Sequence, residues 1–320
     1  MLSEIAPGRY TIEGQTDGRL LQTYLIRSSG QALLIDCGEA STPQQSILPA
    51  LAALDLTPQE LTHVVITHPD VDHQGGAAEL AALAPRALIM CGFEDAPLVG
   101  DPELMIQQRY RAYREHGLDY APDQLSAIRA AAGGAIRVDR TLLGGETLQI
   151  GELTLRVHHG PGHAAGHLMI EDPQLGAWFI ADAVHGRHFP ALDGSPSMPP
   201  TYEDVDRYLA TVAKLRAAAP RSLYTAHFRA LHGDAVGQFL DDSVSFAEGL
   251  ELFLLDQLSA DDLTLAELCE RVATRFGPYT APSWFLMFVV HGHLRRLGRA
   301  GLVAQGVGGV AAPQFTLATR

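Results

Sequence analysis

Seven histidine and aspartate residues, spaced unevenly along the chain, constrain the fold more than any other feature of the sequence. Four of them crowd into the segment from Thr67 to His73, and the other three follow far downstream. The set comprises His68, Asp70, Asp72, His73, His163, Asp182 and His227. Imidazole nitrogens and carboxylate oxygens hold zinc, iron or manganese in hydrolytic sites, where an open metal position activates water. The sequence therefore predicts a fold that gathers these segments around two metal ions.

The first cluster follows a predicted strand. Residues 61–66 read Leu-Thr-His-Val-Val-Ile, a run with the length and β-branched content of a buried strand. Thr67 onward is then a loop at the carboxyl end of that strand, where ligands collect in layered α/β folds. Gly75 and Gly76 allow a tight turn, and the composition of residues 77–84 favours a helix.

The motif order resembles that of the metallo-β-lactamase superfamily. His68-x-Asp70-x-Asp72-His73 is similar to the H-x-H-x-D-H signature of that family, with one substitution at the second ligand position. Four more elements resemble the family in the right order: the opening strand Leu33-Leu34-Ile35-Asp36-Cys37-Gly38, the loop Gly160-Pro161-Gly162-His163-Ala164-Ala165-Gly166-His167, Ile180-Ala181-Asp182 and Thr225-Ala226-His227. The resemblance runs from about Ile5 to His232 and implies an αββα sandwich of two facing sheets with helices outside.

We expect a metal-dependent hydrolase. One ion would be held by His68, Asp70 and His163, and the other by Asp72, His73 and His227, with Asp182 and a hydroxide shared between them. The hydroxide would attack the acyl carbon of an ester, thioester or lactone. Asp72 and Asp182 are the expected catalytic residues, Asp72 by orienting the hydroxide or passing a proton. Zinc is the first expectation for both ions, with iron and manganese as alternatives.

Asp70 departs from the family pattern, which has histidine at this position. A third carboxylate around the site shifts its preference toward harder ions such as iron or manganese. The flavodiiron oxidoreductases resemble this arrangement, with Glu at the position, but their flavin domain has no counterpart here. An iron-dependent oxidoreductase or dioxygenase is therefore the alternative function. The sequence leaves open whether Asp70 binds metal directly.

Other histidines are interpreted as structural. His167 is expected to brace the metal loop. The remaining ones near ligand loops could contact substrate, but a structural role is favoured for each: His158, His159, His185 and His188. His63 and His116 have no motif around them.

Length predicts two domains in the 320 residues. We expect a catalytic domain at residues 1–233, with a helical insertion or lid at 93–140, and a small mainly helical domain at 234–320. The insertion carries arginines and tyrosines between residues 103 and 120 that could line a substrate pocket.

The C-terminal part resembles the winged-helix tail of one branch of the superfamily. Phe246 to Leu258 has helical spacing, Thr264 and Glu267 have capping-box spacing, and residues 302–317 predict a hairpin that turns at Gly308-Gly309. Winged helices often bind DNA, so a metal-dependent nuclease is a further alternative. From Asp234 onward, however, the tail holds six arginines and ten carboxylates, and we favour dimer contact or closure over the catalytic cleft.

Composition bounds the partners and the cellular setting. The formal net charge of −14 disfavours binding to nucleic acid. Three cysteines with no paired spacing argue against disulfides, and no apolar stretch is long enough to span a membrane. The N-terminus lacks an export pattern. We expect a cytoplasmic protein that acts on a small-molecule acyl substrate, with a homodimer left open.

Overall fold

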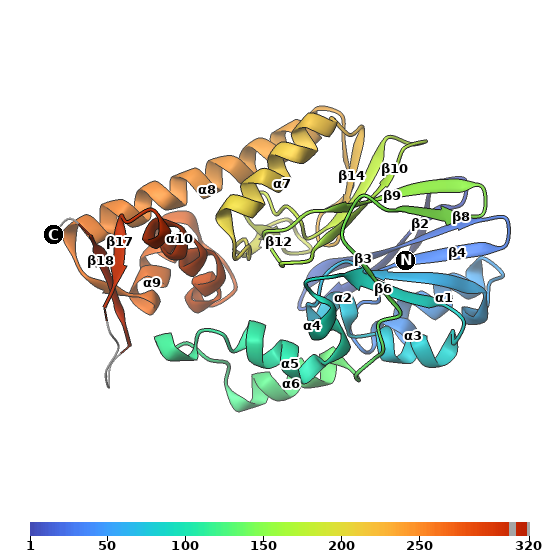
Figure 1. The fold of residues 1–320 in the computed structure, drawn as a ribbon, viewed down its shortest axis with the longest axis horizontal. Helices are drawn as coiled ribbons and strands as arrows, with labels where there is room; N and C mark the ends of the chain where they lie inside the picture. The colour runs from blue at the N-terminus through green and yellow to red at the C-terminus, as the bar shows by residue number, and fades with distance from the viewer. Residues whose placement is uncertain (307–311, 319–320) are drawn as a thin grey trace.

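Two β-sheets form the centre of the molecule. The computed structural model describes residues 1–306 and 312–318, and Figure 1 shows their arrangement. The first sheet has the strand order β1-β2-β3-β4-β5-β6-β7. Its strands are β1 (Leu2–Ala6), β2 (Arg9–Thr16), β3 (Arg19–Ser28), β4 (Gln31–Ile35), β5 (Leu61–Ile66), β6 (Leu88–Gly92) and β7 (Arg140–Leu142). From β4 to β7 the neighbouring strands are parallel.

The second sheet faces the first, in the order β15-β14-β11-β10-β9-β8. Its strands are β8 (Thr147–Ile150), β9 (Leu153–His159), β10 (Leu168–Asp172), β11 (Ala177–Ala181), β14 (Ser222–Thr225) and β15 (Leu231–His232). Side chains alternate along a strand, so Leu33 and Ile35 of β4 pack between the sheets with Leu155 and Phe179, while Leu34 faces outward.

Helices cover the outer face of each sheet. On the first sheet, α1 (Leu48–Ala53) and α3 (Ala77–Leu83) bury Leu51 and Leu80. On the second, α7 (Val205–Ala218) buries Val212 and Leu215 against the outward side chains of the sheet. These four layers confirm the predicted αββα sandwich. Shorter elements complete the layers: η1 (Pro43–Ile47), η2 (Pro58–Glu60), α2 (Val71–Gln74), β12 (Phe189–Pro190) and β13 (Pro196–Met198).

The insertion between the sheets consists of short helical pieces. They are α4 (Ala96–Gly100), α5 (Pro102–Met105), η3 (Ile106–Tyr110), η4 (Arg114–His116) and α6 (Pro122–Ala132). The backbone turns at Gly117, whose φ of 75° is left-handed and ends η4. In Figure 1 the insertion extends from the sandwich toward the C-terminal elements.

The C-terminal part begins with a long helix that connects it to the sandwich (Figure 1). Its elements are α8 (Asp234–Ala260), β16 (Leu263–Thr264), α9 (Leu265–Phe276), η5 (Ser283–Leu286), α10 (Met287–Arg299), β17 (Val303–Gln305) and β18 (Gln314–Leu317). The predicted capping box is present, since the Thr264 side chain accepts a hydrogen bond from the backbone of Glu267. The hairpin turn predicted at Gly308-Gly309 lies outside the described residues. The mainly helical tail agrees with the predicted fold class, while its winged-helix identity and the domain boundary at 233/234 stay predictions.

Cys37, Cys91 and Cys269 are buried free thiols. In the described part of the chain, no helix combines the length and apolar character needed to cross a membrane.

Candidate metal centre

All seven predicted ligands lie at the carboxyl ends of strands. His68 to His73 follow β5 and lead into α2. Asp182 directly follows β11, and His227 lies two residues after the end of the neighbouring strand β14. His163 lies in the loop between β9 and β10. Gly162 lets this loop approach α7, because a Cβ there would lie 2.5 Å from the Tyr208 Cα, and its φ of 137° favours glycine. The two-sheet architecture thus brings distant segments to one edge.

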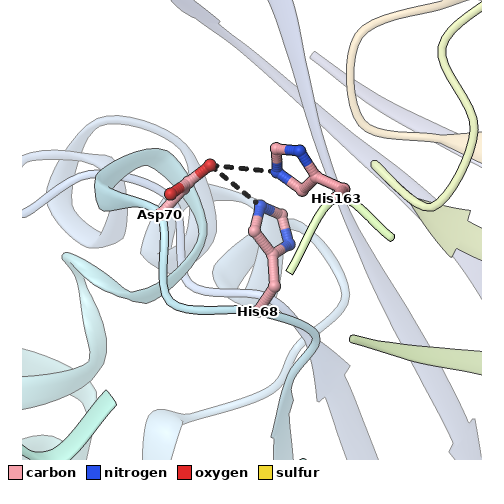
Figure 2. Close-up of side chains that lie close together, drawn as sticks. All are labelled: His68, Asp70 and His163. Atoms are coloured by element: carbon pink, nitrogen blue, oxygen red, sulfur yellow. Dashed lines mark hydrogen bonds and ion pairs between the residues drawn. The ribbon is translucent and has the colours of Figure 1, made fainter. Parts of the chain in front are cut away.

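The first ligand group consists of His68, Asp70 and His163. Figure 2 shows the Asp70 carboxylate pointing at both imidazoles. Its Oδ2 lies 3.6 Å from His68 Nε2 and 3.0 Å from His163 Nε2. The three donor atoms converge closely enough to surround a cation.

The second ligand group consists of Asp72, His73, His227 and Asp182. His227 Nε2 lies 3.2 Å from Asp72 Oδ2 and 3.3 Å from Asp182 Oδ2. His73 Nε2 lies 3.6 Å from the same Asp182 oxygen and 3.9 Å from Asp72 Oδ1. Asp182 also lies close to His68, so its carboxylate stands between the two groups.

Hydrogen bonds to the far side of each ring aim the Nε2 atoms inward. His73 Nδ1 lies 2.9 Å from Asp36 Oδ2, and His227 Nδ1 lies 2.8 Å from the carbonyl of Leu20. Among the described residues, the Nε2 atoms of His68 and His73 are buried without a hydrogen-bond partner. Buried imidazole nitrogens normally have partners, so these two unsatisfied nitrogens point to a ligand.

The donor spacing fits a metal ion. Donors about 2.0–2.1 Å from a tetrahedral zinc lie about 3.3 Å from one another. The histidine–aspartate separations within the two groups run from 3.0 to 3.9 Å. The donor chemistry and the spacing therefore fit the divalent metals that the sequence predicted, while the individual ligand assignments stay predictions.

Electrostatics keep the carboxylates of the second group ionised. Burial opposes ionisation of Asp72, but the adjacent His73 and His227 lower its pKa to about 2. Burial likewise disfavours a charged His227, yet Asp182 and Asp72 raise its pKa to about 9. For His68, burial and the nearby His73 lower the pKa to about 4, so its ring is neutral at pH 7. The carboxylate charge is thus balanced by protons that a cation would displace.

Asp70 is paired with an arginine that the sequence did not connect to it. Arg109, on η3 of the insertion, is 7% exposed, and its Nε donates to Asp70 Oδ1 while its Nη2 lies 3.0 Å from Asp70 Oδ2. Its Nη1 lies 2.9 Å from an oxygen of Glu203. The sequence indicated Arg109 only as one of several arginines in a possible pocket wall, because residues 39 apart carry no local pairing signal.

Two of the remaining histidines, His167 and His185, lie beside the proposed ligands, and two others, His158 and His159, contact neighbouring polar groups. His167 stacks on His68 with ring centroids 4.8 Å apart, consistent with the predicted bracing, and His185 lies in a group with His163 and Asp182. Within residues 1–306 and 312–318, the His167 and His185 rings are buried without hydrogen-bond partners, so His185 lies nearer the centre than the sequence indicated. His158 pairs with Glu171, and His159 bonds the Ala165 carbonyl.

A cavity of about 590 Å³ opens at the centre. Its lining includes members of both ligand groups and a wall of large apolar side chains from the insertion and the tail: Tyr110, Tyr120, Ile128, Phe285 and Phe288. Carboxylates in the lining outnumber cationic groups. The carboxylates belong to Asp17, Glu39, Asp70, Asp72 and Asp182, and the cationic groups to Arg19 and Arg109. The site can therefore accept an apolar group beside the ligands but disfavours a polyanion.

The profile of the Metallo-beta-lactamase superfamily matches residues 17–227, more than half of the chain. The chain belongs to this superfamily. The predicted resemblance is confirmed, and the match contains every predicted ligand, from His68 to His227.

Relatives within the superfamily include thioester hydrolases. The chain is 24% identical over 226 residues to the atrochrysone carboxyl ACP thioesterase of Emericella nidulans. The match covers 71% of this chain and 57% of that protein. It is 29% identical over 163 residues to the hydroxyacylglutathione hydrolase of Rhodopseudomonas palustris. This match covers 50% of this chain and 47% of that protein. The chain thus spans about half the length of the curated relatives it matches.

A solved structure has a similar fold that includes the tail. A metallo-beta-lactamase family protein of Thermus thermophilus superposes with a TM-score of 0.77 at 20% identity, covering 98% of this chain and 100% of that chain. This likeness shows the fold alone.

Proposed function

We propose that the chain is a metal-dependent hydrolase of thioesters with an apolar acyl group. The observation that carries the proposal is the cavity, in which the candidate metal ligands and an aromatic wall face the same space. The superfamily relatives with thioesterase or hydroxyacylglutathione hydrolase activity in their names support this class of substrate.

The proposed metal ligands are the residues predicted from the sequence. Asp72, His73, His227 and Asp182 would hold one divalent ion, zinc first, with iron and manganese as alternatives. His68, Asp70 and His163 form the other ligand group, which differs because an arginine contacts two of its donor atoms. A bound ion in such a site lowers the pKa of water and polarises a carbonyl oxygen.

Side chains of the protein supply the remaining chemistry. Asp72 is 15% exposed and lines the cavity, so its carboxylate can accept a hydrogen bond from an attacking water and orient a lone pair toward the acyl carbon. The apolar wall excludes competing water and positions the acyl chain. A thiolate leaves readily because thiols have a pKa of about 8.5, so a thioester demands less of Asp72 as a proton donor than an alkyl ester does.

The charge of the cavity favours small or neutral thiol carriers. Carboxylates predominate in the lining, so the phosphates of an acyl-coenzyme A would be repelled unless they stayed outside. The same negative potential of the cavity disfavours the binding of phosphodiesters.

A substrate panel tests the function. We expect hydrolysis of aryl and medium-chain acyl thioesters of N-acetylcysteamine, with a lower KM than for the matching coenzyme A thioesters. EDTA should abolish turnover and added Zn²⁺ restore it. Phosphodiester cleavage without acyl hydrolysis, or oxygen uptake dependent on iron, would overturn the proposal.

A further inference from the structure

Arg109 is fully engaged by the protein at the first ligand group. A guanidinium has five N–H donors. Nε donates to Asp70 Oδ1, and Nη1 donates to the His163 carbonyl at 3.1 Å and to Glu203 at 2.9 Å. Nη2 donates to Asp70 Oδ2 at 3.0 Å and lies 3.2 Å from His163 Nε2. All three guanidinium nitrogens therefore contact acceptors within the chain, which hold Arg109 in place.

The same contacts occupy the donor atoms that a metal would need. His163 Nε2 lies 3.0 Å from Asp70 Oδ2 and 3.2 Å from Arg109 Nη2, and both oxygens of Asp70 accept hydrogen bonds from Arg109. With the guanidinium in place, Nε2 faces a cationic group and a carboxylate that is already paired. A metal ion at these atoms would have to displace Arg109.

Charge points in the same direction. Arg109 is buried and permanently protonated, and a divalent ion between His68, Asp70 and His163 would stand beside it in a low-dielectric setting. The second ligand group has the opposite character. In the described part of the chain, the carboxylates of Asp72 and Asp182 pair with histidines and with no lysine or arginine.

We propose that Arg109 is the resident cation of the first ligand group, so that the chain binds a single metal ion at Asp72, His73, His227 and Asp182. The Asp70–Arg109 pair would then replace the second ion of a two-metal site. Because all three guanidinium nitrogens of Arg109 contact the protein, Arg109 acts as a positioning residue that holds His163 and Asp70 and supplies positive potential. The inference rests on the proposed function only because both concern the same metal centre.

Metal counting tests this proposal. The purified full chain is stripped with chelator, incubated with excess Co²⁺ or Zn²⁺, desalted and measured by elemental analysis. We expect one tightly held equivalent in the wild type and two in Arg109→Met, which removes the guanidinium from Asp70 and His163. The matched control Arg111→Met removes a partly exposed arginine of the same segment, paired with Asp119, and should retain one equivalent.

A second variant guards against misfolding. Arg109→Met leaves the partly buried carboxylates of Asp70 and Glu203 without their cation. The double variant Asp70→His/Arg109→Met is therefore prepared as well, with its fold checked by circular dichroism. It should also hold two equivalents, and its Co²⁺ visible absorption should rise in two steps. Two tight ions in the wild type, or one ion in the folded double variant, would overturn the inference.

The thioester assay separates the two proposals. Hydrolysis by a wild type that holds two ions would leave the proposed function standing and reject the role of Arg109. A single tight ion without thioester hydrolysis would do the reverse.

Discussion

The aspartate at the end of β4 shows how one residue positions the centre. Asp36 has a φ of 63°, in the left-handed region, and its carboxylate accepts the Thr67 backbone N–H at 2.7 Å. Its other oxygen lies 2.9 Å from His73 Nδ1. One side chain therefore fixes both the start of the ligand loop and the orientation of a proposed ligand.

We expect Asp36→Asn to weaken metal binding by about 10–100-fold, because an amide orients the His73 ring less strongly than a carboxylate. Competition with a fluorescent zinc chelator measures the change. Asp139→Asn is the control, since that carboxylate lies apart from the centre and accepts a hydrogen bond from the Ile89 backbone. Equal affinity in both variants would contradict the assigned role of Asp36.

Asp70→Asn tests the buried ion pair at the same scale. The substitution leaves the Arg109 charge buried without its main partner, so we expect roughly 3 kcal/mol lower free energy of unfolding by urea denaturation. The exposed pair Asp119–Arg111 provides the control, and Asp119→Asn should cost less than about 1 kcal/mol. A similar small loss in both variants would show that the Asp70–Arg109 pair adds little. The metal content of Asp70→Asn should stay at one equivalent.

At the scale of elements, local pattern predicted the sandwich better than the insertion. The strand predicted at residues 61–66 is β5 with the same bounds, and the helix predicted at 77–84 is α3, which ends at Leu83. Both have a composition typical of their element, and turn residues flank them. The sequence predicts the insertion only as helical, and contacts with the tail, such as Tyr113 on Phe288, are encoded by no local pattern.

The contact between insertion and tail should respond to acid. The His116 and His291 rings lie 4.9 Å apart, and burial together with His116 lowers the pKa of His291 to about 4. A histidine whose pKa is depressed in the folded state takes up protons preferentially when unfolded. The loss of folding stability that this histidine causes is therefore absent above the unfolded pKa of about 6.5, and it grows as the pH falls toward 4.

We expect His291→Gln to remove a loss of stability on the order of 2 kcal/mol between about pH 6.5 and pH 4. Urea denaturation at both pH values, compared with the wild type, measures the difference. The exposed His232, on β15, provides the control variant His232→Gln. An unchanged pH dependence in His291→Gln would contradict the assignment.

At the scale of the whole molecule, the tail and the sandwich share a core and a cavity. The buried His293 lies 2.9 Å from the Tyr202 hydroxyl, and Arg296 pairs with Asp206 on α7. Phe285 and Phe288 of the tail line the cavity together with side chains of the insertion. Closure over the cleft, the use of the tail that the sequence favoured, is consistent with this arrangement.

A chain that ends at Gly233 should aggregate or lose selectivity among acyl thioesters. The removal of the tail exposes the apolar side chains of α7 that pack against it. It also opens one wall of the cavity. Size-exclusion chromatography and the ratio of kcat/KM for aryl and short acyl groups measure the two effects. A monodisperse truncated protein with unchanged selectivity would show that the tail is only an appendage.

The sequence by itself determined the superfamily, the layered fold and the set of proposed ligands. Each ligand is marked by a local signal, because a strand, a short loop and a metal-binding side chain are contiguous at every strand end. Only the tertiary structure decided what Asp70 faces. The replacement of histidine was visible in the sequence, but Arg109 meets it through the packing of an irregular insertion, and a buried charge takes whichever partner the fold presents.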